Sequence, residues 1–101
     1  MNLDPYIPTT LMRDLAGHDR APSAYLLYLW LWAQTRGIGR AEIGCSLQDM
    51  ATDTGLSKSS IQNALRRLRR RRLVETRRDG PTSPCFYRVL APWAGEGPRE
   101  S

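Results

Sequence analysis

The stretch LQDMATDTGLSKSSIQNALRRLRRRR, residues 47–72, decides the fold of this chain. It ends in six arginines within seven residues, 66–72, with no acidic residue among them. On a helix, like charges four residues apart repel each other by roughly 0.2–0.5 kcal/mol per pair. A chain that needed only a soluble helix would interleave glutamates. The run is therefore either a solvated charged face or a surface for a polyanion, and the residues before it favour the second.

The charge of the whole chain is concentrated in its second half. The 101 residues are enough for one domain with a single modest core, and the net charge is +5. Residues 57–90 hold ten basic and two acidic residues, a local balance of +8, while the rest of the chain, with five basic and eight acidic residues, carries −3. Such clustering predicts a surface that meets a polyanion.

Catalytic and metal-binding patterns are missing from the sequence. His18 is the only histidine, and Cys45 and Cys85 are the only cysteines, so neither a metal set nor a disulfide framework is expected. The two cysteines are interpreted as small buried residues, with a redox role as the alternative. No phosphate-binding glycine loop occurs. We expect no enzyme activity, no metal, no cofactor and no small-molecule ligand.

The beginning of the chain is not typical of a signal peptide. The apolar run AYLLYLWLWA, residues 24–33, is about half the length that spans a bilayer. It predicts a buried helix rather than a membrane span. We expect a cytoplasmic protein.

Three segments are expected. Residues 1–20, with two prolines, are predicted to be an extended N-terminal lead-in with one helical turn near TTLMRDLA. Residues 21–91 are expected to form the folded domain. Residues 92–101 are rich in proline and glycine and are expected to form a disordered tail. The domain opens with a helix from Pro22 to about Thr35, since proline suits the first helical position.

Capping signals mark two further helices. Ser46, with Asp49 three residues on, opens the second helix, and Gly55 ends it. Ser57 caps the third helix, which is expected to reach about Arg72 with one apolar stripe of Ile61, Ala64, Leu65 and Leu68. EIGC (42–45) predicts a very short strand. LVETRR (73–78) and CFYRVL (85–90) alternate as strands do, and DGPTSP (79–84) joins them.

The segment LQDMATDTGLSKSSIQNALRRL resembles bacterial and phage winged helix-turn-helix DNA-binding domains. Ala51 stands where the two helices touch, Gly55 stands where the turn needs a positive φ, and Ile61 is the buried aliphatic residue of the second helix. The resemblance implies an α+β, mainly α fold: three helices and a C-terminal β-hairpin wing. It also implies sequence-specific binding of double-stranded DNA, with the recognition helix, 57–72, in the major groove and the wing, 73–90, on the backbone.

A small transcriptional regulator is the expected role. The segment IPTTLMRDLAGHDRAPSAYLLYLWLWAQ is also similar to the lead-in of plasmid replication initiators, so a plasmid or phage replication-initiation or maintenance factor is one alternative. A winged-helix module that binds protein or RNA is another.

The exposed arc of the third helix, taken at about 100° per residue, carries the predicted DNA contacts. Gln62, Asn63 and Arg66 suit base edges, with Ser59 beside them. The helix start and the later arginines suit phosphates. Arg67 and Arg71 point toward the back and are interpreted as solvated. The full predicted set, including two arginines of the wing, is Lys58, Ser59, Gln62, Asn63, Arg66, Arg69, Arg70, Arg77 and Arg78. The alternative for the wing is a hairpin that only closes the core.

The first helix is apolar nearly all round, which predicts a homodimer through Tyr25, Leu29 and Trp32. A dimer would bind half-sites about 34 Å apart. In the alternative, the lead-in covers this helix within one chain, through Tyr6, Ile7, Leu11 and Leu15.

Overall fold

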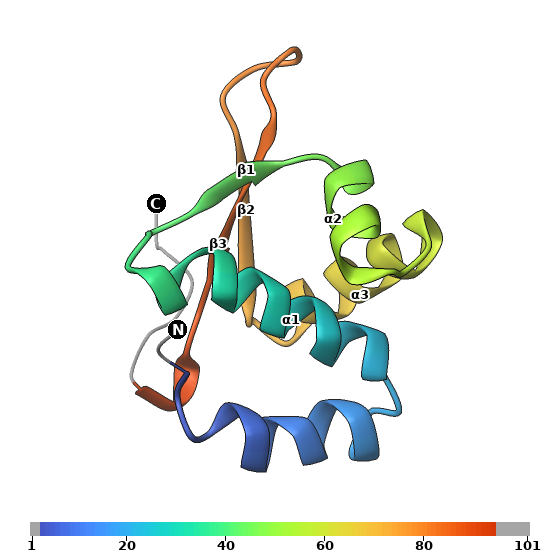
Figure 1. Ribbon diagram of the computed structural model, residues 1–101, viewed down its shortest axis with the longest axis vertical. Helices are drawn as coiled ribbons and strands as arrows, with labels where there is room; N and C mark the ends of the chain where they lie inside the picture. The colour runs from blue at the N-terminus through green and yellow to red at the C-terminus, as the bar shows by residue number, and fades with distance from the viewer. Residues whose placement is uncertain (1–2, 95–101) are drawn as a thin grey trace.

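The computed structural model describes residues 3–94, which form helices packed around a central helix and a small antiparallel sheet (Figure 1). The mainly helical α+β fold with a C-terminal wing is thereby confirmed. The helices and strands are α1 (Pro22–Gln34), β1 (Ile43–Cys45), α2 (Leu47–Thr54), α3 (Lys58–Arg70), β2 (Val74–Arg78) and β3 (Cys85–Val89).

α1 is the centre of the molecule, with the N-terminal helical segment on one side and α2 and α3 on the other (Figure 1). Pro22 occupies its first turn, and the Thr35 hydroxyl ends it by donating to the Leu31 carbonyl at 2.7 Å. Tyr28 is fully buried, and its hydroxyl donates to the Leu90 carbonyl at 2.7 Å, which ties α1 to the chain after β3. The predicted helix 22–35 is confirmed to within one residue.

The N-terminal segment, which we define as Ile7–His18, is helical rather than extended. It consists of two short π-helical stretches, Ile7–Leu11 and Arg13–His18. Their apolar residues Ile7, Leu11 and Leu15 are buried in the same core as α1. The expectation of an extended lead-in was wrong because these residues gain a helical partner surface on α1, a tertiary effect that outweighs the local proline signals.

The end of the described chain also packs. Pro92–Ala94 form a 3₁₀ turn, and the Trp93 ring stacks on Tyr6 with centroids 4.3 Å apart. Trp93 Nε1 donates to Asp4 Oδ2 at 3.0 Å. The tail predicted to be disordered from residue 92 is therefore ordered at its start. Residues 95–101 of that prediction lie outside the described residues.

The helix-turn-helix has the predicted caps. The Ser46 hydroxyl accepts from the Asp49 backbone at 3.0 Å, and the Asp49 carboxylate accepts from the Ser46 backbone at 3.1 Å. Gly55 ends α2 with φ +78°, a conformation that costs glycine little. The Ser57 hydroxyl then accepts from the Ser60 backbone at 3.1 Å and opens α3.

The sheet has the order β1-β3-β2 and is antiparallel throughout. β2 and β3 extend beyond the helices as the wing (Figure 1). Gly44 of β1 lies opposite Phe86, and a Cβ at Gly44 would come within 2.8 Å of the Phe86 ring. Glycine at this position therefore lets Phe86 lie across β1.

Candidate nucleic-acid interface

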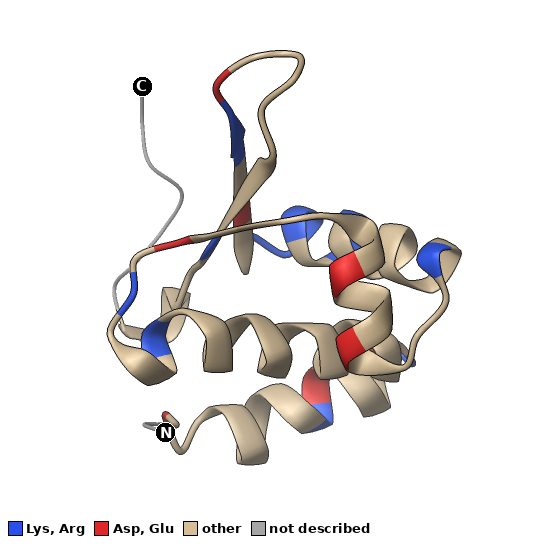
Figure 2. Ribbon diagram, turned by 45° about the horizontal axis from the view of Figure 1, so that its top comes forward, with Lys and Arg blue, Asp and Glu red and all other residues tan. Residues whose placement is uncertain are grey.

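α3 separates its apolar and polar residues as predicted. Ile61, Ala64, Leu65 and Leu68 are buried, and the opposite side is exposed. Figure 2 shows basic positions along α3 and on the wing, whereas α2 carries acidic ones. All nine side chains predicted to contact DNA are exposed: Lys58, Ser59, Gln62, Asn63, Arg66, Arg69, Arg70, Arg77 and Arg78.

Two of these side chains act as a pair. Arg66 Nη1 donates to Asn63 Oδ1 at 2.9 Å, one turn apart on the exposed side of α3. The bond occupies the amide oxygen of Asn63 and fixes the direction of the guanidinium. A planar guanidinium held in this way can present a donor pair to a guanine edge, and the Asn63 amide keeps its two N–H donors.

The helix ends before the arginine run does. α3 ends at Arg70, Arg71 is its C-cap, and Arg72 has φ +58°, a left-handed conformation that is uncommon for residues other than glycine. The expected end at Arg72 was two residues too late. The turn at Arg72 directs the chain toward β2. Directly before β2, the Leu73 backbone donates to the Leu68 carbonyl at 2.8 Å.

Arg67 and Arg71 are not merely solvated, as the sequence had suggested. Arg67 Nη1 lies 3.6 Å and Arg71 Nε 3.4 Å from Asp19 Oδ2, and the Asp19 side chain is only 8% exposed. The hydrogen bond between His18 and Asp19, followed by the charges of Arg71 and Arg67, lowers the pKa of Asp19 against the opposing effect of burial. These two arginines therefore join α3 to the end of the N-terminal segment.

The two arginines of the wing have different surroundings. Arg77 Nη1 donates to Asp79 and its Nη2 to Glu42, and the guanidinium lies 4.5 Å from the centroid of the Phe86 ring. The hydrogen bonds to Glu42 and Asp79 raise the pKa of Arg77. Arg78, one residue on, is exposed and has no ion pair among the residues that the structure describes. Arg78 is thus the wing cation that is available to a phosphate.

A cleft of about 360 Å³ runs between the wing and the helix-turn-helix. Lys58 at the start of α3 and Arg78 of the wing both line it, together with Gln48 near the start of α2. The sequence did not single out Gln48, because its position beside the wing depends on how α2 packs.

A second pocket, of about 250 Å³, lies where α1 begins beside α3. Arg20, Ser60 and Asn63 line it, and Arg20 has φ +52°. Arg20 was also not predicted as a site residue. Nothing in the local sequence marks it, since the start of α1 meets the flank of α3 only in the folded chain.

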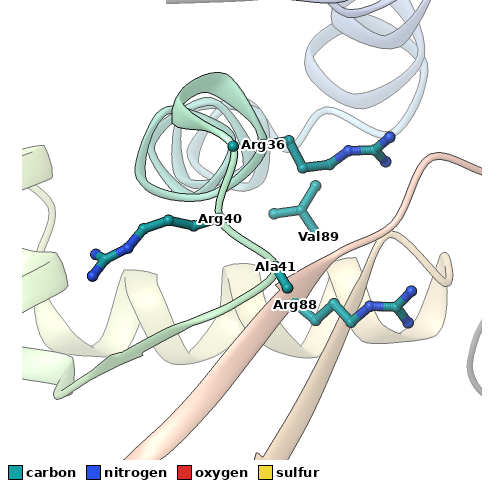
Figure 3. A pocket seen from close by; sticks show the side chains of 6 residues that line it. Arg36, Arg40, Ala41, Arg88 and Val89 are labelled. Atoms are coloured by element: carbon teal, nitrogen blue, oxygen red, sulfur yellow. The ribbon is translucent and has the colours of Figure 1, made fainter.

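A third pocket, of about 360 Å³, lies between the end of α1 and β3. Figure 3 shows Arg36 and Arg88 extending to the same side of it, while Arg40 extends to the other. The Arg36 guanidinium lies 5.0 Å from the centroid of the Trp32 ring, and Arg88 Nη1 donates to Glu75 at 3.3 Å. Because the three guanidinium groups do not converge, this pocket is a poor candidate for an anion site.

Within residues 3–94, no group of three or more metal-ligating side chains occurs. In the same range, no helix is long and apolar enough to cross a membrane.

Comparison with known proteins agrees with this geometry. Residues 37–78, which include β1, α2, α3 and β2, match the family model of the IclR helix-turn-helix domain. These residues form a helix-turn-helix DNA-binding domain. The predicted winged-helix family and DNA-binding function are confirmed.

Among solved structures, the DNA-binding domain is similar to a crystal structure of the AntR antimony-specific transcriptional repressor. The two are 20% identical in sequence, with a TM-score of 0.49, over 92% of this chain and 83% of the repressor chain. No curated protein sequence matches the chain.

Proposed function

We propose that the protein is a small transcriptional regulator that places α3 in the major groove of double-stranded DNA and the wing on the adjacent backbone. One arrangement carries the proposal. The exposed side of α3 bears polar and basic side chains, and Lys58 at its start lines the same cleft as Arg78 of the wing. A major groove about 12 Å wide admits a helix, and a wing beside that helix reaches the phosphates.

The side chains divide into two roles. Gln62 and the Asn63–Arg66 pair lie in the first half of α3 and read base edges. Arg69 and Arg70 lie one turn later, where a straight helix leaves the groove, and they contact phosphates together with Lys58 and Arg78. Base contacts give specificity, whereas phosphate contacts give affinity for any sequence.

The test begins with selection of bound sequences from random duplex DNA. The variants Gln62→Ala, Arg66→Ala, Arg69→Ala and Arg70→Ala are then titrated against the selected and a scrambled duplex at two salt concentrations. We expect Gln62→Ala and Arg66→Ala each to lose about 1–3 kcal/mol of binding free energy on the selected duplex, and to lose specificity at particular base pairs. The last two should weaken binding to both duplexes. Selection that enriches no sequence, or an equal loss for all four variants on both duplexes, would contradict the proposal.

The homodimer stays a prediction, without the interface first expected. Tyr25 and Trp32 are 6% and 5% exposed, and the Tyr25 hydroxyl donates to the Ile7 carbonyl at 3.0 Å, so the chain itself covers most of that surface. Leu26 of α1 remains 49% exposed. Sedimentation velocity, free and on a selected duplex, tests the dimer, and Leu26→Glu should produce a monomer if this face of α1 is the interface. We also expect the protein in the cytoplasm, where the DNA is.

A further inference from the structure

The two cysteines of the chain lie directly opposite each other on neighbouring strands. Cys45 is the last residue of β1 and pairs with Cys85, the first residue of β3. Opposite residues of an antiparallel pair point to the same face of the sheet, with Cα atoms about 4.5–5.5 Å apart. This spacing falls within the range of about 4.4–6.8 Å that a disulfide requires. Both thiols are free in this structure.

The surroundings give the two thiols different access. Cys45 is 7% exposed, whereas Cys85 is only half-buried, and both line the cleft that holds Lys58 and Arg78. Burial, and then the negative charge of Asp49, raises the pKa of Cys45 to about 11. A small oxidant that enters the cleft therefore meets Cys85 first.

The pair lies where the helix-turn-helix meets the wing. Cys45 directly precedes Ser46, the cap of α2, and Cys85 pairs on its other side with Arg78 of β2. A bond between the two sulfurs would join the start of α2 to the first residue of β3, next to the loop 79–84 of the wing. It would thus link two elements that must fit the same DNA duplex.

We propose that Cys45 and Cys85 form a reversible intramolecular disulfide on oxidation by a hydroperoxide, and that this bond weakens DNA binding. The second half of the proposal rests on the proposed function.

The reaction takes two steps. The Cys85 thiolate, whose proton has passed to solvent, attacks one oxygen of the peroxide and becomes a sulfenic acid as the O–O bond breaks. The departing hydroxide or alkoxide takes up a proton from solvent and leaves as water or an alcohol. Cys45 gives up its proton to solvent and, as thiolate, attacks the Cys85 sulfur. The S–O bond of the sulfenic acid breaks, and the departing hydroxide takes up a proton from solvent to give water. Two electrons pass from the sulfurs to the peroxide, and a dithiol reductant restores both thiols.

The expected loss of affinity follows from geometry. Cβ atoms of opposite residues are about 4.5–5.5 Å apart, whereas a disulfide holds them at about 3.5–4.5 Å. Closing the bond pulls β1 toward β3 and shifts Ser46 relative to Arg78. The contacts of α3 and of the wing then no longer match one duplex.

The experiment treats the reduced full chain with hydrogen peroxide and follows mass, free thiols and DNA affinity. We expect the loss of two hydrogens within a monomeric chain, affinity for a selected duplex lower by about 5-fold or more, and recovery of both with dithiothreitol. Cys85→Ser, whose position is half-buried, should keep the affinity of the reduced protein and become insensitive to peroxide. Cys45→Ala should instead accumulate sulfenic or sulfinic acid at Cys85.

Four outcomes would overturn the proposal: unreacted thiols, overoxidation of Cys85 in the native sequence, a disulfide between two chains, or a disulfide that leaves affinity unchanged. A reduced protein that binds no duplex would refute the proposed function instead, because the mass measurement needs no DNA.

Discussion

The arginines of α3 and its C-cap fall into two groups whose surroundings differ. Arg66, Arg69 and Arg70 are exposed and have no carboxylate partner among residues 3–94. Arg67 and Arg71, on the neighbouring side of the same helix, reach the buried carboxylate of Asp19. One run of a single residue type therefore has two uses. One group offers charge to a polyanion, and the other ties the helix to the N-terminal segment.

The difference also explains how six arginines can follow one another closely. Like charges on neighbouring turns repel, but Asp19 offsets part of the positive charge on the side that faces the protein. The remaining charge is directed to the exposed side, where counterions are released when DNA binds. This division can be tested first at the N-terminal segment, which Asp19 directly follows.

The largest expected effect is on stability. Leu15 of the N-terminal segment is 0% exposed, so Leu15→Ala should lower the free energy of unfolding by about 2–5 kcal/mol. Leu26→Ala is the matched control, because Leu26 is 49% exposed and its removal should change stability by less than about 0.5 kcal/mol. Urea denaturation measures both. Equal small losses would mean that the segment does not belong to the core.

The next effect is at Asp19. Asp19→Asn should lower the free energy of unfolding by about 1 kcal/mol, because the arginine partners are 38% and 40% exposed and solvent screens the ion pairs. It should also free Arg67 and Arg71, and make the log–log salt dependence of DNA binding steeper by about 0.9 for each freed arginine that reaches a phosphate. Asp53→Asn on exposed α2 makes the same charge change without the ion pairs and should leave stability unchanged.

Acid should remove the same contribution. The pKa of Asp19 is lowered in the folded state, first by His18 and then by Arg71 and Arg67. The stabilisation is therefore fully present above the unfolded value of about 3.9 and is lost as the pH falls through the lower folded value. The difference in stability between the native protein and Asp19→Asn should be constant from neutral pH down to about 4 and shrink below it. A difference that persists in strong acid would assign it to packing.

The helix-turn-helix could be predicted because its signals are local. Ser46 with Asp49, Gly55 and Ser57 each fix the backbone within a few residues of their own position, and the structure has each of these caps. The stripe of α3 follows from helical periodicity alone. The exposure of those predicted DNA contacts that lie on α3 follows from the same periodicity.

The contacts that the sequence did not predict are between distant segments. Asp19 reaches Arg67, and Glu42 reaches Arg77, only after the chain has folded. The N-terminal segment is helical because Ile7, Leu11 and Leu15 find a surface on α1, whereas its prolines suggested an extended chain. Tyr25 and Trp32, on which the expected dimer face depended, are also buried within the chain. A local pattern cannot report a partner that another segment supplies.

The smallest effect separates the two arginines of the wing. Arg78→Ala should weaken binding to all duplexes alike and make the log–log salt dependence shallower by about 0.9, the value for one lost phosphate contact. Arg77→Gln should leave this slope nearly unchanged, because the Arg77 guanidinium is already paired with the carboxylates of Glu42 and Asp79. Titration by fluorescence anisotropy at four or more salt concentrations gives both slopes. Arg77→Gln could instead flatten the slope as much as Arg78→Ala does. Arg77 would then have to separate from Glu42 and Asp79 when the protein binds DNA. The wing would then change its internal contacts on binding, and the ion pairs seen in the free protein would be a resting arrangement.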